Sequence, residues 1–148
     1  MMRTMNDAGF ALLKAHEGLK LQAYLCPGGV LTIGYGHTGD VKPLQQITIE
    51  EAERLLQKDV ARFERCINHS VLIPLTSNQF SALVCFAFNI GVEAFLRSTL
   101  LNLLNRGWYE QVPAQLMRWT MSRGVELPGL ITRRKDEAAL WNKEDADV

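Results

Sequence analysis

The sequence lacks both a net charge and a long apolar segment. Its 16 lysines and arginines balance 16 aspartates and glutamates, so it gives no support for a strong nucleic-acid-binding protein, which would carry a basic face. No stretch is long and apolar enough to span a membrane, and no apolar core follows the basic residue near the N-terminus, as a secretory signal requires. We therefore expect neither a nucleic-acid partner nor a membrane anchor.

Cysteine is also scarce. The three residues Cys26, Cys66 and Cys85 cannot all pair with one another, and their spacing does not match that of a zinc site. Cys85 lies in an apolar run and is expected to pack in the core, and Cys66 is expected to be inert. We expect no metal and no cofactor.

The remaining composition is that of an ordinary globular protein, with 47% apolar and 22% charged residues. A chain of 148 residues is long enough to bury about two-thirds of its unfolded surface as one domain. It contains no repeat and no low-complexity tract. We expect a single domain and a monomer.

The pattern of apolar residues over 5–16 predicts a short amphipathic helix. Asn6 or Asp7 can cap its start, and Gly18 is the residue expected just beyond its end. Glu17 then falls in the last turn, where the negative end of the helix dipole favours a carboxylic acid over a carboxylate. Glu17 is therefore a candidate proton donor, although a single glutamate is more often a solvated surface residue.

Two strands are predicted next, over 22–26 and 30–35, separated by a turn at 27–29 with the sequence Pro-Gly-Gly. If these three residues form the loop, Cys26 lies opposite Val30, and Thr32 lies on the same face one diagonal step away. Diagonal neighbours are about 7–8 Å apart between backbones, so we expect room for one water molecule between the two short side chains. A bound water facing an acid is the arrangement of an inverting glycosidase.

The sequence predicts that the rest of the chain is helical. A capping box at Thr48 and Glu51 opens a helix to about Ile67, Thr76 or Ser77 begins an apolar helix that Gly91 ends, and further helices are predicted near 98–106, 109–120 and 131–142. The fold class is therefore α+β, mainly α. We expect a hairpin lobe at about 20–45, a helical lobe from 1–18 and 68–148, and a linking helix at about 49–67.

The spacing of Glu17, Cys26 and Thr32, with eight and five residues between them, resembles that of phage-type lysozymes, the endolysins of glycoside hydrolase family twenty-four. That family has Glu, then Asp or sometimes Cys, then Thr at these intervals. The segment 33–38, Ile-Gly-Tyr-Gly-His-Thr, continues the similarity, as do 88–91 and 129–134. The resemblance spans nearly the whole chain and implies a lysozyme-like, two-lobed fold.

The resemblance implies a muramidase that cleaves the β-1,4 bond between N-acetylmuramic acid and N-acetylglucosamine in peptidoglycan, and so lyses the host cell. Glu17 would be the general acid, and Thr32 would position the attacking water or bind the sugar. Cys26 stands where many relatives have Asp. A free thiol has a pKa of about 8.5, so Cys26 acts as a base or a nucleophile only if the site lowers its pKa. Otherwise it is a small hairpin residue.

Two further residues enter through the resemblance. His37 would support the site by hydrogen bonding. Arg133, or Arg134 beside it, would open the final helix and pair with Glu17, an arrangement that orients the acid and favours its ionised form. The alternative is a pair of solvated arginines in a first turn. Separately, Arg133, Arg134 and Lys135 could form a local basic cluster that attracts the anionic peptidoglycan.

The resemblance also implies a place of action. The protein would wait in the host cytoplasm until a holin releases it to the periplasmic cell wall, where its partners are the peptidoglycan glycan strands. Two other functions stay open. A lytic transglycosylase needs only one acid and yields anhydro products, and a wall-binding protein would bind glycan without turnover and would not need Glu17.

Overall fold

The computed structural model describes residues 2–145. Contacts divide the chain into two units. The helical unit runs to Leu12 and resumes at Phe63, and the hairpin unit spans Leu13–Arg62. Helices α1 (Asp7–Glu17) and α2 (Ile49–Ser70) contribute residues to both units. Residues 1 and 146–148 of the predicted domain lie outside the described residues.

Helix α1 confirms the first predicted helix. The side chain of Asn6 caps its start, because its Oδ1 accepts a hydrogen bond of 2.9 Å from the Gly9 N–H. Gly18 follows the last residue with a φ of 72°, and its N–H donates to the Lys14 carbonyl at 3.0 Å. Since few residues other than glycine adopt this conformation readily, the helix ends directly after Glu17.

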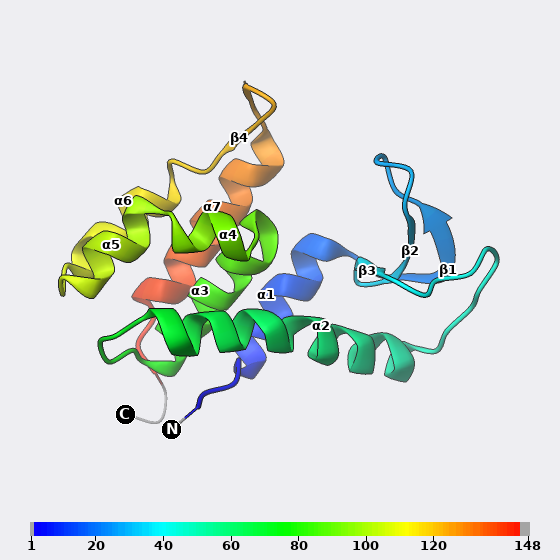
Figure 1. The fold of residues 1–148 in the computed structure, drawn as a ribbon, viewed down its shortest axis with the longest axis horizontal. Coiled ribbons are helices and arrows are strands. Elements are labelled where there is room, and N and C mark those ends of the chain that lie inside the picture. The colour runs from blue at the N-terminus through cyan, green and yellow to red at the C-terminus, as the bar shows by residue number, and fades with distance from the viewer. Residues whose placement is uncertain (1, 146–148) are drawn as a thin grey trace. The chain divides into compact units, whose positions relative to one another are not determined.

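The hairpin unit contains a three-stranded antiparallel sheet in the order β1 (Lys20–Leu25), β2 (Leu31–Gly34), β3 (His37–Thr38), drawn in blue and cyan in Figure 1. Gly34 brings the sheet close to α2. A Cβ at Gly34 would lie 3.5 Å from side-chain atoms of both Ala52 and Ile47. The sheet and the helix therefore pack closely around Gly34.

Helix α2 begins as its capping box predicts. The Thr48 Oγ1 accepts from the Glu51 N–H at 3.1 Å, and the Glu51 Oε1 accepts from the Thr48 N–H at 3.3 Å. The helix continues past the predicted end near Ile67 to Ser70.

The helical unit is built around α3 (Ser77–Ile90), which packs against α7 (Pro128–Asn142). A capping box of Thr76 and Gln79 starts α3, and Gly91 ends it. The shorter helices of this unit are α4 (Val92–Leu96), α5 (Thr99–Asn105), a 3₁₀ turn at Tyr109–Gln111 and α6 (Val112–Leu116). Fully buried side chains of the unit include Phe80, Phe86, Phe95, Leu104 and Leu116.

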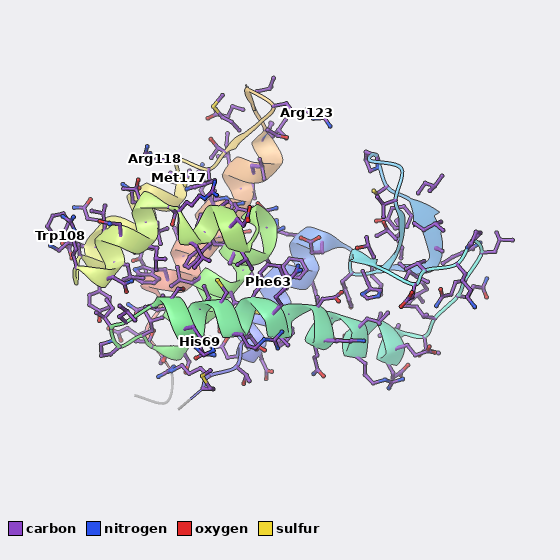
Figure 2. The ribbon with its side chains drawn as sticks, viewed as in Figure 1. Phe63, His69, Trp108, Met117, Arg118 and Arg123 are labelled. Carbon is purple, nitrogen blue, oxygen red and sulfur yellow. The ribbon has the colours of Figure 1, made fainter. Side chains whose placement is uncertain are left out.

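Three details of the predicted helices are wrong. The helix predicted at 109–120 is a 3₁₀ turn followed by the short α6, and α4 was not predicted. A hairpin of β4 (Met121–Ser122) and β5 (Val125–Glu126) follows α6. Its two-residue turn has positive φ at Arg123 and Gly124, 53° and 78°, which is typical of a tight hairpin. Figure 2 labels Arg123 in this turn. Helix α7 begins at Pro128 rather than near 131, since proline suits a first helical turn.

The predicted α+β, mainly α fold class is confirmed. Of the helices within residues 2–145, none is sufficiently long and apolar to cross a membrane.

Candidate active site

Glu17 is the last residue of α1 and is half-buried. Its Oε1 lies 3.2 Å from the position that a Cβ on Gly36 would take. Gly36 has a φ of 85°, so both its backbone conformation and its missing side chain suit glycine. The carboxyl group of Glu17 therefore rests against the segment between β2 and β3.

The hairpin register predicted from the sequence is confirmed. Leu25 pairs with Leu31 and Tyr24 with Thr32, and the Cys26 N–H donates to the Val30 carbonyl at 3.0 Å. The loop is the predicted Pro-Gly-Gly at 27–29, closed by a hydrogen bond of 2.8 Å from the Gly29 N–H to the Cys26 carbonyl. Because directly paired residues share a face of a sheet, Cys26 and Thr32 lie on the same face.

The thiol of Cys26 folds back over its own loop. Its Sγ lies 3.7 Å from the position of a Cβ on Gly28. The pKa of this free thiol is lowered, first by hydrogen bonding from the Val30 backbone and then from that of Gly28, against a smaller opposing effect of burial. Backbone N–H groups that converge on one atom stabilise an anion there. The hairpin turn thus favours the thiolate of Cys26, as its use as a base or a nucleophile requires.

Thr32 is almost covered, with only 3% of its surface exposed. Its Oγ1 donates to the Val30 carbonyl at 2.9 Å, and the side chain is also within hydrogen-bonding reach of the Cys26 thiol. The water site predicted between Cys26 and Thr32 stays a prediction. Since a hydroxyl carries one proton, Thr32 donates either to Val30 or to the thiolate at a given moment.

His37 lies in β3 rather than at the end of the second strand. It pairs with Ile33, so it lies on the opposite face of the sheet from Thr32. Its Nδ1 is 2.7 Å from the Asp59 Oδ2 of α2. His37 therefore links the sheet to α2, and any support that it gives to Glu17 or Cys26 acts through the sheet.

A second cluster near Glu17 was not predicted. Lys14, one turn before Glu17 on α1, has its Nζ 2.5 Å from the Glu53 Oε2 of α2 and 5.8 Å from the centre of the Tyr35 ring. The Tyr35 hydroxyl also lies 3.5 Å from Glu53. These contacts fix the last turn of α1 against α2 and the strand segment before Gly36. The three-residue interval in the sequence predicts that Lys14 and Glu17 share a face of α1. No local sequence pattern identifies Glu53 as the ion-pair partner of Lys14.

Arg133 and Arg134 lie in the helical unit, within α7 rather than at its start. They are 5% and 0% exposed, so the alternative of two solvated arginines is wrong, and they do not form a surface cluster with Lys135. Both contact the fully buried Glu137, from the Arg133 Nε at 3.3 Å and the Arg134 Nη1 at 2.7 Å.

Other donors of the two arginines bind further parts of the helical unit. Arg133 donates to the Cys85 carbonyl at 3.3 Å, and Arg134 donates to the Trp119 carbonyl at 3.0 Å and to the Asn89 Oδ1. The predicted pairing of Arg133 with Glu17 joins residues of different units and stays a prediction.

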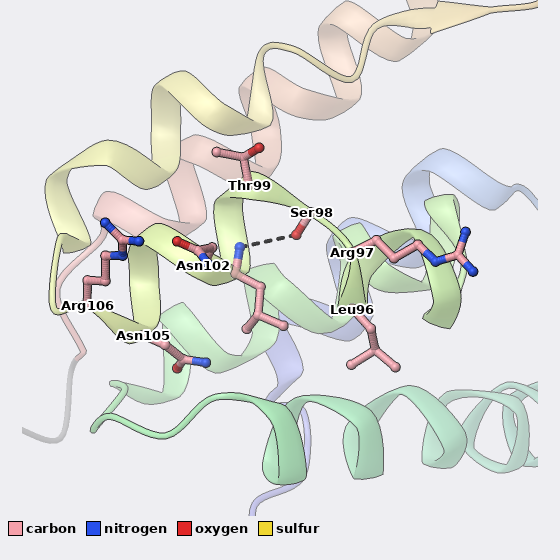
Figure 3. Close-up of a pocket in the computed structure, with 8 residues that line it drawn as sticks. Leu96, Arg97, Ser98, Thr99, Asn102, Asn105 and Arg106 are labelled. Atoms are coloured by element: carbon pink, nitrogen blue, oxygen red, sulfur yellow. Dashed lines mark hydrogen bonds between the residues drawn. The ribbon is translucent and has the colours of Figure 1, made fainter.

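A surface depression of about 630 Å³ lies along α4 and α5, shown in Figure 3. Two of its polar side chains already hold the fold: Ser98 caps α5, and Asn105 binds the backbone of residues 70 and 72. Arg97 and Arg106 extend in different directions in Figure 3. Because its polar groups do not converge, we place the candidate site in the hairpin unit, with Glu17, Cys26 and Thr32.

Comparisons with known proteins identify the family of the chain. The family model described as phage lysozyme matches residues 14–137. The chain is 42% identical to an endolysin of Acyrthosiphon pisum secondary endosymbiont phage 1, over 93% of this chain and 97% of the relative. It is 44% identical to an endolysin of Bacillus phage PZA, but spans only 55% of that protein.

Among solved structures, the chain resembles the muramidase domain of SpmX from Asticaccaulis excentricus. The TM-score is 0.90 and the identity 38%, over 96% of this chain and 99% of that domain. The predicted lysozyme-like fold is therefore confirmed.

Proposed function

The chain belongs to the phage lysozyme family and is a peptidoglycan-hydrolysing endolysin, and from this premise we propose that it is a muramidase. It cleaves the β-1,4 bond between N-acetylmuramic acid and N-acetylglucosamine, and thereby contributes to lysis of the host cell. The observation that supports this most is the arrangement in the hairpin unit. A helix-end carboxyl rests against Gly36, and the same unit holds a thiol whose pKa is lowered beside a threonine hydroxyl.

Glu17 is the proposed general acid. It donates its proton to the glycosidic oxygen as the bond to the anomeric carbon breaks, so that the leaving sugar departs as an alcohol. The contact with Gly36 restricts where the carboxyl group can point.

Cys26 is the proposed anionic partner, in the position where a second carboxylate would act. Its thiolate stabilises positive charge that develops on the sugar ring and accepts a proton from the attacking water, whose oxygen bonds to the anomeric carbon. Attack by the thiolate itself, with a covalent glycosyl-enzyme intermediate, uses the same group and stays open. The backbone donors at Val30 and Gly28 supply the stabilisation that either role needs.

Thr32 is the proposed orienting group. Its hydroxyl contacts the thiol and the Val30 carbonyl, so it can fix the direction of the thiolate, and its remaining lone pair can accept from the water or the sugar. His37 supports the site by holding the sheet on α2 through Asp59.

The route to the cell wall is part of the proposal. The chain acts as a monomer on glycan strands, and it remains in the host cytoplasm until a holin releases it to the periplasmic wall. The similarity to phage endolysins supports this order of events.

The test is the variant Glu17→Gln, which keeps the shape of the side chain and removes the acid. We expect hydrolysis of purified peptidoglycan to fall by about 10²–10⁴-fold, the range that general acid catalysis contributes, with an unchanged circular dichroism spectrum. Glu50→Gln, at an exposed position in the first turn of α2, is the matched control and should keep full activity. A Glu17→Gln protein that still hydrolyses peptidoglycan at the parent rate contradicts the proposal.

A further inference from the structure

Tyr24 shares the face of the sheet that carries Cys26 and Thr32. It pairs directly with Thr32 in the antiparallel register. Cys26 follows two residues later, so its side chain points to the same face as that of Tyr24. Side chains of a directly opposed pair have Cβ atoms about 4.5–5.5 Å apart. Thr32 therefore has the Tyr24 side chain as its neighbour on one side and Thr38 of β3 as its neighbour on the other.

The environment of Tyr24 differs from that of the other two tyrosines of the chain. Tyr35 is buried with its hydroxyl near Glu53, and the Tyr109 hydroxyl donates to the Pro74 carbonyl at 2.7 Å. Tyr24 is 37% exposed, and toward residues 2–145 its hydroxyl makes no hydrogen bond. A phenol that the fold does not use is available to a ligand.

We propose that Tyr24 is a glycan-binding residue of this site. The inference rests on the proposed function, since it takes the face bearing Cys26 and Thr32 as the surface on which the sugar lies. A hexopyranose presents an apolar face of C–H groups and a rim of hydroxyl and acetamido groups. The exposed ring can pack against the apolar face, and the free hydroxyl can bond to the polar rim.

The stability of the fold does not explain why an aromatic side chain stands at Tyr24. The strand is held by backbone pairing with β2 and by hydrogen bonds between Ala23 and Gln45 and between Leu21 and Ile47, none of which needs an aromatic side chain at Tyr24. A threonine would satisfy the strand equally well, because it has a high preference for β structure.

The test measures binding separately from turnover. All variants are made in the Glu17→Gln background, and the probe is glycan strands freed of peptide from purified peptidoglycan, titrated by calorimetry. We expect Tyr24→Thr to weaken binding about tenfold, a loss that corresponds to about 1.4 kcal/mol. Tyr24→Phe, which keeps the ring, should fall between this variant and the parent. Leu25→Thr is the matched control. It introduces a threonine at the next position, whose side chain lies on the opposite face of the sheet, and it should bind glycan like the parent.

Two results would overturn the inference: Tyr24→Thr binding within twofold of the parent, or an equal loss in Leu25→Thr. If Tyr24→Thr does not fold, Tyr24→Phe decides, and unchanged affinity then contradicts the hydrogen bond. Failure of the proposed function has a different signature, because it appears as turnover by Glu17→Gln itself, whatever the residue at Tyr24.

Discussion

The carboxyl oxygen Oε1 of Glu17 lies 3.2 Å from the position that a Cβ on Gly36 would take, closer than most atoms approach a Cβ. Gly36 also adopts a φ of 85°. The glycine therefore serves two purposes, a backbone turn after β2 and a space for the proposed acid.

Gly36→Ala tests the second purpose. The new methyl group should displace the Glu17 carboxyl by a few tenths of an ångström, and we expect peptidoglycan hydrolysis to fall by about tenfold, because small errors in the position of a catalytic group are costly. The unfavourable φ should also lower the free energy of unfolding by about 1–2 kcal/mol.

Gly39→Ala separates the two effects. Gly39 has a similar positive φ of 99° with no atom within 4 Å of a Cβ, so this variant should lose similar stability and keep its activity. Equal activity losses in Gly36→Ala and Gly39→Ala would show that the contact with Glu17 has no part in catalysis.

The two partly exposed thiols should differ in reactivity. Hydrogen bonds from the Val30 and Gly28 backbones lower the pKa of Cys26, whereas burial raises the pKa of Cys66. Since the thiolate is the reacting form, iodoacetamide should modify Cys26 first, with a rate that reaches its midpoint below the usual thiol pKa, and modification should abolish hydrolysis. Peptide mapping across a pH series measures both rates. Preferential modification of Cys66, or full activity after alkylation of Cys26, would be inconsistent with a thiolate in the site.

The helical unit should show a pH-dependent stability that originates at Glu137. Burial raises the pKa of this carboxyl from 4.5 to about 7, although Arg134 and Arg133 oppose the effect. Between these values the folded protein holds the proton more tightly than the unfolded chain does. The contribution of Glu137 to the free energy of unfolding is therefore complete below pH 4.5 and falls as the pH rises to about 7, by up to about 1.4 kcal/mol per unit.

Denaturant unfolding of the parent and of Glu137→Gln at several pH values measures this contribution as a difference. We expect the parent-minus-variant free energy to decrease from pH 4.5 to 7 and to be level outside that window. A difference that increases with pH would mean that attraction by the two arginines exceeds the effect of burial.

Local signals in the sequence predicted most of what surrounds Glu17 and Cys26. A glycine after an amphipathic run located the end of α1, the Thr48 capping box located the start of α2, and the Pro-Gly-Gly turn set the register that places Cys26 beside Thr32. Each depends on residues a few positions apart, so local backbone geometry and short-range hydrogen bonds decide the outcome.

What was missed depends on contacts that are distant in the sequence. The alternative of two solvated arginines in a first turn was wrong, because Glu137, Asn89 and the Trp119 carbonyl satisfy the donors of the fully buried Arg134. The β4–β5 hairpin went unnoticed because its strands are only two residues long. The contact between Thr32 and Cys26 depends on side-chain rotamers, which register does not determine.

The most direct test of the account is mass spectrometry of the products released from purified peptidoglycan. A muramidase adds water across the glycosidic bond, so we expect muropeptides that end in reducing N-acetylmuramic acid, and none from Glu17→Gln. Anhydro products, lighter by one water molecule, would contradict the hydrolytic mechanism and identify a lytic transglycosylase. An absence of products with glycan binding retained would contradict catalysis altogether.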